Sequence, residues 1–380
     1  MRISPLRASL LAALVAAASA LSAAAAEGAG SSGAEFLAIG VGARSAGLGE
    51  SFTGMADDVH SLVYNPAGLA FLRRRELALD HNYYAVGVNH EWLGYAHPTA
   101  WGTFGGAANL VFVSPFESYN AVDNPTGKTS AADASYQLTF ATTLTDSLGV
   151  GVTAKHIRSR LHETTASTFA GDFGFLWKPV ERVRLGGSML HLGPGLRHIA
   201  VTEDLPRTMS GGLGWDVFDR GNFRHNLTVA LDVTKRSDEA ARFGGGVEAI
   251  YDSVLAIRLG GRSAPATGTG LTLGMGLFLF RDDTRGYEID FDYAFVGAGD
   301  FGTSHRAGLT FKFGDPITSV PRAAVLQKSD VYYEGAVRPK ARREREPKID
   351  APVPSPAPRP AARPTTTTPA DPSDFQWINQ

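Results

Sequence analysis

The chain has 380 residues, and its 36 lysines and arginines nearly balance 38 aspartates and glutamates, which leaves a formal net charge of −2. Such a balance argues against nucleic acid as a partner, because nucleic-acid binding needs a basic surface. Cysteine is absent, which excludes disulfide frameworks, cysteine-ligated metal centres and thiol nucleophiles. Glycine accounts for 43 of the 380 residues, about 11% compared with a usual share of roughly 7%. This excess favours a β-rich chain with many turns.

The N-terminus has the layout of a secretory signal peptide. Two arginines precede an apolar run over residues 10–21, and three alanines come directly before Glu27. We expect cleavage after Ala26, so that residues 1–26 are removed and the mature protein leaves the cytoplasm. A single N-terminal membrane anchor is the alternative, but the small residues at its end suit a peptidase better than a bilayer.

Residues 27–75 are predicted to form a small, mostly irregular plug segment. Glycines are dense from residue 40 to residue 54 and allow tight backbone turns, whereas Asp57 and Asp58 can start a short helix that Asn65 and Pro66 end. The segment has little core of its own, so it must pack inside a larger structure. The candidate plug and gate residues are Asp57, Asp58, Asn65, Pro66, Ala67 and Gly68.

From residue 76 onward, apolar and polar residues alternate with the period of two that is typical of β-strands. Between Tyr287 and Phe295, aromatic and aliphatic residues occupy one face, and Glu288, Asp290 and Asp292 occupy the other. Fourteen such segments start near residues 76, 86, 101, 133, 148, 168, 183, 208, 224, 241, 254, 268, 287 and 303. No window of 18 consecutive apolar residues follows the signal peptide, so a transmembrane helix is not expected there.

These strands predict an all-β fold, a 14-stranded antiparallel transmembrane β-barrel over residues 76–313. Those 238 positions (313 − 76 + 1) give about 17 residues for each strand with its connection, enough for a strand that crosses a bilayer. An exported chain with an even strand count can close its edges, as hydrocarbon requires. We expect the plug segment to pack inside the barrel mouth. A secreted or periplasmic β-protein is the alternative.

Several charged residues lie on the polar faces of the strands and are predicted to point into the lumen. These lumen charges are Glu248, Arg258, Asp290, Asp292 and Arg306. Tight turns would bring Glu248 beside Arg258, and Asp292 beside Arg306, so that charge pairs tie neighbouring strands and narrow the pore. Solvated wall charges of little energetic effect are the alternative.

The C-terminal segment, residues 314–380, is predicted to be a disordered proline-rich tail. Nine of the 21 prolines lie between Pro347 and Pro372, and a basic stretch covers residues 338–345. An even number of strands returns the chain to its starting side, so the tail is expected in the periplasm. It would contact peptidoglycan or a periplasmic envelope protein; an inert linker is the alternative.

Eleven short motifs follow one another along the chain, each at one position. They are Phe36-Leu37, Gly40–Arg44, Gly47–Gly49, Phe52-Thr53, Ala56–Asp58, Asn65–Leu69, Leu205-Pro206, Val247–Ala249, Leu255–Gly260, Asp300–Gly302 and His305-Arg306. In these motifs the chain resembles the PorV/PorQ family of FadL-like outer-membrane proteins over residues 34–313. The resemblance implies a 14-stranded barrel with an N-terminal plug, which agrees with the strand count. Glu50 stands where the family usually has a small residue.

The sequence does not favour dinucleotide binding or histidine-based chemistry. The stretch from Gly297 to Gly302 matches a dinucleotide-binding fingerprint, but a strand follows it where that motif needs a helix, so we interpret it as a hairpin turn. The ten histidines form no HExxH pair, and there is no GxSxG elbow. No catalytic residue, metal or cofactor is therefore expected, and aromatic rings such as Tyr83, Tyr84, Trp92, Trp101 and Trp177 are expected at the bilayer edges.

The function inferred from the sequence is that of an integral protein in the outer membrane of a Gram-negative-type bacterium. Named members of the resembled family serve type IX protein secretion, which implies a protein-export component that binds secreted cargo or periplasmic envelope proteins. The alternative is a FadL-like passive channel for the uptake of small hydrophobic compounds. A purely structural barrel is a third possibility. Outer-membrane lipid is the expected surrounding in each case.

Overall fold

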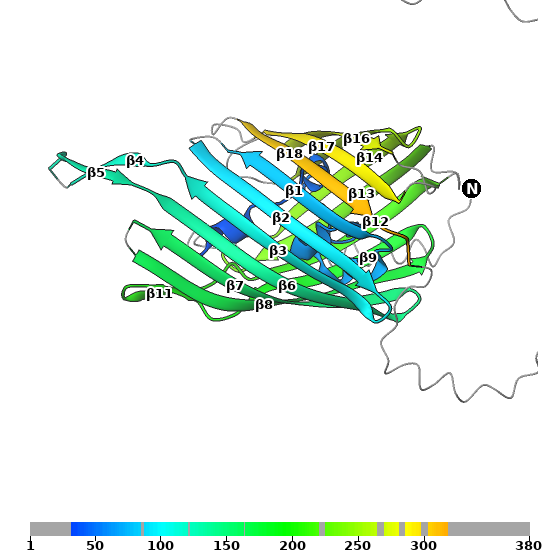
Figure 1. The fold of residues 1–380 in the computed structure, drawn as a ribbon, viewed down its shortest axis with the longest axis horizontal. Helices are drawn as coiled ribbons and strands as arrows, with labels where there is room; N and C mark the ends of the chain where they lie inside the picture. Colours follow the sequence, from blue (N-terminus) through cyan, green and yellow to red (C-terminus); the bar gives the residue numbers. More distant parts are fainter. Residues whose placement is uncertain are drawn as a thin grey trace, which may run out of the picture. The chain divides into compact units, whose positions relative to one another are not determined.

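The fold is a closed antiparallel β-barrel (Figure 1). The computed structural model describes residues 32–84, 87–120, 122–162, 164–219, 225–263, 270–280, 286–297 and 303–317. The predicted signal peptide, the predicted tail beyond residue 317 and all but the first residue of the hairpin turn predicted at residues 297–302 lie outside this range. Within it, fourteen strands form the barrel, and β1 closes the ring by pairing with both β2 and β18. The predicted strand number and antiparallel closure are therefore confirmed.

Each barrel strand starts within four residues of its predicted start. The strands are β1 (Arg75–Tyr83), β2 (Val88–Thr99), β3 (Gly102–Val113), β6 (Ala131–Thr145), β7 (Leu148–Leu161), β8 (Thr164–Val180), β9 (Val183–Leu192), β12 (Thr208–Asp219), β13 (His225–Arg236), β14 (Arg242–Tyr251), β15 (Leu255–Arg262), β16 (Leu271–Leu279), β17 (Tyr287–Gly297) and β18 (Thr303–Phe313). The agreement arises because alternation is a local property that neighbouring elements do not alter.

The two faces of the wall differ as the alternation predicts. On β17, Phe291 and Phe295 are exposed on the outer wall, while Glu288, Asp290 and Asp292 are buried on the inner side. A wall with large apolar side chains outside and polar ones inside suits a barrel in lipid. Within the described residues, no helix is long and apolar enough to span a membrane.

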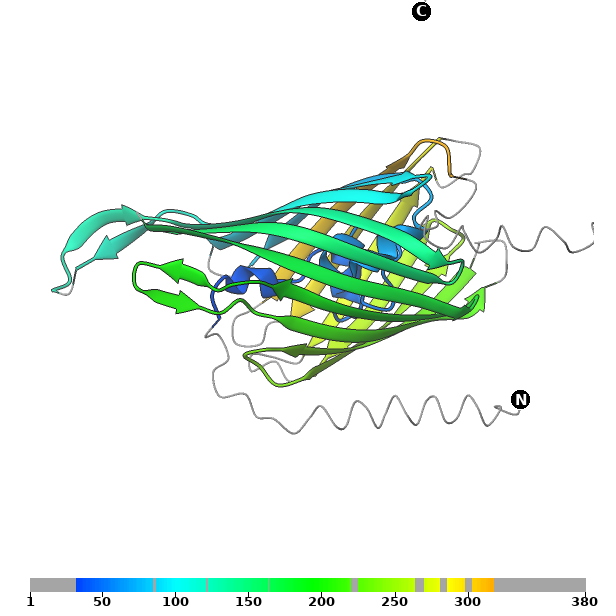
Figure 2. The same cartoon turned by 90° about the horizontal axis from the view of Figure 1, so that it is seen from below.

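The two ends of the barrel have different connections (Figure 2). One end carries two extra hairpins, β4 (Phe116–Tyr119) with β5 (Pro125–Thr129), and β10 (Leu196–His198) with β11 (Val201–Glu203). We call it the hairpin end. At the other end, two-residue connections join β2 to β3, β6 to β7, and β8 to β9, so we call it the short-turn end. The sequence did not predict the two hairpins, because their strands are only three to five residues long.

The N-terminal segment fills the interior of the barrel, where Figure 2 shows it in blue. We call residues 32–74 the plug. It contains η2 (Glu35–Ala38), α2 (Ala43–Gly47), α3 (Ser61–Tyr64) and η3 (Pro66–Phe71). Leu62 and Leu69 of the plug pack in one buried cluster with wall residues that include Trp92. The plug thus obtains its core from the barrel.

Close backbone packing explains why the plug is rich in glycine. Gly49 has a φ of 66°, and a Cβ atom there would lie 2.4 Å from the carbonyl oxygen of Gly261 on β15. A larger residue would strain the backbone and also push the plug off the wall.

The predicted helix from Asp57 to Val63 is shorter than expected. The Asp58 carboxylate accepts a hydrogen bond from the backbone N–H of His60 at 2.8 Å, and this turn delays the helix to Ser61. Asn65 and Pro66 end the helix as predicted.

Candidate functional site

Asn65 joins the plug to the wall. Its Nδ2 donates to the carbonyl oxygens of Thr53 in the plug, at 3.0 Å, and Phe175 on β8, at 2.9 Å. Its Oδ1 accepts a hydrogen bond from the backbone N–H of Ala67 at 3.2 Å, which caps η3, and Pro66 begins that helix. Gly68 allows η3 to pack closely against the backbone at Ala56, because a Cβ atom at position 68 would lie 2.2 Å from the Ala56 carbonyl oxygen. The four predicted residues from Asn65 to Gly68 therefore form one buried turn.

Arg44, which the sequence did not single out, connects both predicted plug aspartates to the wall. Its Nη1 lies 2.6 Å from Asp57 Oδ1 and 2.8 Å from Asp58 Oδ2. Its Nη2 lies 2.9 Å from Glu248 Oε1 on β14. Burial alone would lower the pKa of Arg44, but Asp57 and Glu248 outweigh burial and raise it, so the guanidinium stays charged. The plug is thus held by a charge network.

One of the two predicted strand-tying charge pairs is confirmed. Glu248 lies opposite Arg258 in the register of β14 and β15, and Glu248 Oε2 is 2.6 Å from Arg258 Nε. Arg258 also reaches Asp292, whose Oδ1 is 2.6 Å from its Nη1. Asp290, the other predicted acid on β17, pairs with Lys312 at 2.8 Å.

The predicted pairing of Asp292 with Arg306 is wrong. Asp292 lies opposite Gly308, and Arg306 lies opposite Ala294. The connection between β17 and β18 is centred one residue later than expected, and such a shift moves each cross-strand partner by two positions. The Arg306 side chain instead forms an ion pair with Glu50 of the plug.

Arg306 and Arg262 hold Glu50 between them. Arg306 Nη2 lies 2.9 Å from Glu50 Oε1, and Arg262 Nη1 lies 2.7 Å from Glu50 Oε2. Burial disfavours the charged carboxylate, but the two arginines outweigh this effect and lower the pKa of Glu50 to about 2. Glu50 also has a φ of 61°, which is unusual for a residue with a side chain. Glu50 therefore joins the plug to β15 and β18 through two ion pairs. We call a charged plug residue that is ion-paired to the wall in this way a latch.

His60 is a second latch that the sequence did not reveal. Its Nδ1 lies 3.0 Å from Asp58 Oδ1, and its Nε2 lies 2.8 Å from Asp80 Oδ2 on β1. Its ring stacks on Trp92, with centroids 5.1 Å apart. Burial lowers the pKa of His60, but Asp80 and Asp58 outweigh burial and raise the pKa well above its ordinary value, which favours the charged ring.

Trp92 corrects one sequence expectation. It was expected at a bilayer edge, but only 3% of it is exposed, because the alternation of β2 turns Trp92 inward and Leu93 and Tyr95 outward. Trp101 and Trp177 do lie on the outer surface at the short-turn end, with 79% and 44% exposed.

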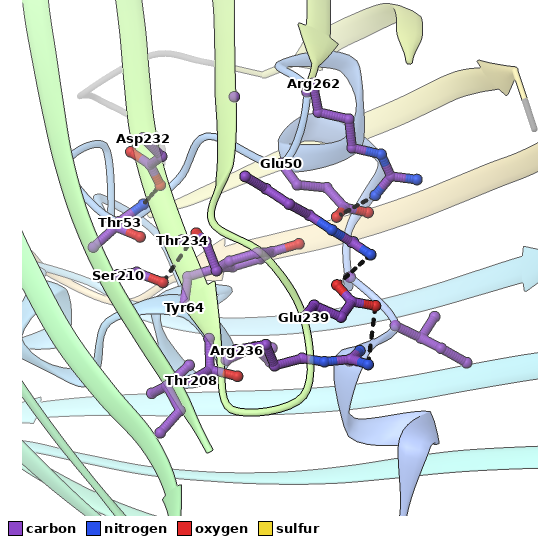
Figure 3. A pocket seen from close by; sticks show the side chains of 18 of the residues that line it. Glu50, Thr53, Tyr64, Thr208, Ser210, Asp232, Thr234, Arg236, Glu239 and Arg262 are labelled. Atoms are coloured by element: carbon purple, nitrogen blue, oxygen red, sulfur yellow. Dashed lines mark hydrogen bonds and ion pairs between the residues drawn. The ribbon is translucent and has the colours of Figure 1, made fainter. Parts of the chain in front are cut away.

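A cavity of about 120 Å³ lies between the plug and the wall formed by β9 and β12 to β15 (Figure 3). Its polar lining includes Glu50, Thr53, Tyr64, Thr208, Ser210, Asp232, Thr234, Arg236, Glu239 and Arg262. Its apolar lining includes Leu37, Ile39, Val63, Leu190 and Phe243. The wall residues come from the hairpin ends of their strands, so the cavity lies toward that end.

The glutamates of the cavity lining form ion pairs with arginines. Glu239 lies 3.0 Å from Arg236 and also contacts Arg242, and Asp232 accepts a hydrogen bond from the backbone N–H of Thr53 at 2.7 Å. Among the residues whose positions are described, no group of three His, Asp or Glu side chains could hold a metal ion.

Comparison with known proteins identifies the class of fold. The model of an uncharacterised protein family, UPF0164, matches residues 9–191. No curated protein matches the chain. The toluene transporter TbuX of Ralstonia pickettii is similar in structure, with a TM-score of 0.52 and 14% identity over 73% of this chain and 98% of the transporter.

Two mutants of the monoaromatic hydrocarbon channel TodX match the chain with TM-scores and identities similar to those of TbuX. The ΔS2 mutant has a TM-score of 0.54 at 13% identity, and the ΔS2S3 mutant 0.51 at 15%; each match covers 72% of this chain and 99% of the channel. The chain thus has an outer-membrane-type β-barrel fold that resembles hydrocarbon channels. The PorV/PorQ resemblance stays a prediction from the sequence.

Proposed function

We propose that the protein is an outer-membrane channel for the passive uptake of small hydrophobic compounds. The observation that carries this proposal is a plugged 14-stranded barrel with a cavity left between plug and wall. The similar solved structures are named as a toluene transporter and monoaromatic hydrocarbon channels. This support favours the channel hypothesis over the export hypothesis, which the sequence had placed first.

The orientation of the barrel supports uptake from outside. Barrels of the outer membrane have short turns on the periplasmic side and longer loops on the outside. The hairpin end is then extracellular, and the cavity is the part of the lumen that an incoming molecule reaches first. β18 ends beside the start of β1, with Phe313 opposite Arg75, at the short-turn end. The predicted tail would therefore begin in the periplasm.

The size and lining of the cavity suit a small molecule that is largely apolar. A cavity of roughly 150 Å³ accepts one benzene-sized molecule, so 120 Å³ is of the right order. Leu37, Val63 and Leu190 offer apolar contact, and ion-paired glutamates border them. Passage beyond the cavity requires the plug to shift, because charged contacts bind it to the wall on several sides.

Uptake of labelled toluene tests the proposal. The full-length protein would be expressed in cells that have no hydrocarbon channel of their own. The toluene that these cells accumulate would be compared with the toluene in cells carrying the empty vector. The variant Ala240→Trp places a large ring at the cavity and is expected to reduce uptake severalfold. The matched control Ala249→Trp adds the same ring on the outer face of β14 and should leave uptake unchanged. Equal accumulation with and without the wild-type protein would reject the channel.

A further inference from the structure

We propose that the outer wall at β6, β7 and β8 binds a phosphorylated glycolipid of the lipid A type from the outer leaflet. Its phosphate would lie on Arg158 and Arg160, and an acyl chain would lie in an apolar groove below them. This surface is on the outside of the barrel, so its role does not depend on what passes through the lumen.

Arg158 and Arg160 face outward near the hairpin end of β7. The outward residues before them are apolar, Val150, Val152 and Ala154, and His156 comes next. Both arginines are exposed. Within the described ranges, neither arginine side chain has an ion pair or a hydrogen bond, so both guanidinium groups are available to a ligand.

The cross-strand neighbours leave room for an anion. Arg158 lies between Ala134 on β6 and Ser167 on β8, and Arg160 lies between Ala132 and Thr165. None of these neighbours is acidic, and their small side chains do not cover the guanidinium groups. The two hydroxyl groups can donate further hydrogen bonds to phosphate oxygens. Arginine forks bind phosphate in a bidentate manner, so the set is complementary to a phosphomonoester.

The height of the arginines matches the headgroups of the outer leaflet. Leu148, at the short-turn end of β7, lies opposite the exposed ring of Trp177, which marks the inner edge of the apolar band. Ten residues separate Leu148 from Arg158, or ~34 Å along the strand. At a strand tilt of ~40° this corresponds to ~26 Å across the membrane, close to the apolar band of ~25 Å in such barrels.

An apolar groove of about 580 Å³ lies on the same wall below the arginines. Gly106 and Ala108 of β3 are small, and the groove is bordered by Tyr95, Leu138 and Phe169. A Cβ atom on Gly106 would touch nothing closer than 3.5 Å, so the floor of the groove is open. An acyl chain fits this lining.

His156 connects the groove to the arginines. It lines the groove, its ring lies 5.0 Å from that of Phe169, and it precedes Arg158 by two residues on the same face. Charge and apolar surface are therefore continuous, as in an amphiphile with an anionic head. Free phosphate would use only the upper part.

Native mass spectrometry of the full-length protein in detergent tests this assignment. Bisphosphorylated lipid A is the probe, and dephosphorylated lipid A and inorganic phosphate are the two comparison ligands. We expect lipid A to be retained and the double variant Arg158→Gln/Arg160→Gln to bind it about tenfold more weakly or worse. The variant Gly106→Leu should weaken binding by filling the groove, with the arginines intact.

The control variant is Lys128→Gln/Arg207→Gln, which removes two positive charges at the hairpin end away from the groove. It should bind lipid A like the wild type. Equal binding of dephosphorylated lipid A, equal weakening in the control, or retention of inorganic phosphate alone would overturn the proposal. Since toluene uptake is a separate measurement, failure of lipid binding does not bear on the channel.

Discussion

Glu50 shows how single residues of the plug are tied to the wall. Its carboxylate neutralises Arg306, which is buried, and Arg262. A buried ion pair adds little compared with an apolar pair, but the loss of one partner leaves a charge uncompensated in the interior. The same reasoning applies to His60 between Asp58 and Asp80. Loss of one partner from either latch is therefore expected to loosen the plug.

The variant Glu50→Gln should loosen the plug without unfolding the barrel. It keeps the shape of the side chain but leaves Arg306 without its counter-charge, so amide exchange in residues 40–64 should become about tenfold faster or more. Hydrogen exchange followed by mass spectrometry measures this. Glu239→Gln is the control, because it removes a carboxylate from the same cavity that pairs only with wall residues and the adjacent turn. Equal exchange in both variants would show that Glu50 is not a latch.

Asn65 and Pro66 should differ in their effect on the plug. Asn65→Ala removes hydrogen bonds to two carbonyl groups in the interior and the cap of η3, and an unsatisfied buried group costs ~1–3 kcal/mol. Pro66→Ala removes only the fixed φ, which costs less. We expect the barrel to survive in the double variant and uptake to change, with most of the effect in Asn65→Ala. Limited proteolysis of the plug and toluene uptake measure both; equal effects of the single changes would contradict this ranking.

At the level of elements, the plug contacts the barrel through nearly every sector of the wall. α2 lies against β15, β16, β17 and β18, whereas η3 lies against β3, β6, β7 and β8. Such a plug cannot leave the lumen without breaking several ion pairs together. A local shift of one part, such as the segment next to the cavity, costs less than complete expulsion.

A disulfide between plug and wall tests whether such a shift is needed. A Cβ atom on Gly244 of β14 would lie 2.6 Å from Ser51 Oγ, so Ser51→Cys with Gly244→Cys places two thiols within bonding reach. The chain has no other cysteine. Oxidation should reduce toluene uptake severalfold and a reducing agent should restore it, while each single variant should be insensitive. Unchanged uptake in the oxidised variant would mean that passage leaves this part of the plug in place.

For the whole molecule, the barrel is complete at Phe313, because β18 already pairs with β1 along its length. Among the described residues, β18 is the last strand of the closed ring. The channel and export hypotheses differ in the role they give to the predicted tail, because only the export hypothesis requires the tail to bind a partner protein.

Deletion of residues 320–380 should leave the barrel inserted in the membrane. Heat-modifiable migration of the truncated protein on gels measures this, with full-length protein as the control. If the protein is a channel, toluene uptake should also remain at the wild-type level. Unchanged uptake together with loss of a co-purifying envelope protein would assign the tail a docking role of its own. Failure to insert would contradict the prediction that the fold ends before the tail.

The sequence by itself determined the fourteen barrel strands and their two faces. Alternation is read within one strand, and a slip of one residue would put every apolar side chain on the wrong side, so Phe291 and Asp292 could be placed from the pattern alone. The turn from Asn65 to Gly68 was also visible, because Asn and Pro have strong local preferences.

Only the tertiary structure decided which charges meet. Arg306 was assigned to Asp292, but a connection centred one residue later sends it to Glu50, which is 256 positions away in the chain. Arg44, His60 and the cavity likewise depend on a plug that folds back inside strands formed much later in the sequence. Such partners are set by the closure of the barrel around the plug, and local periodicity carries no information about distances across the lumen.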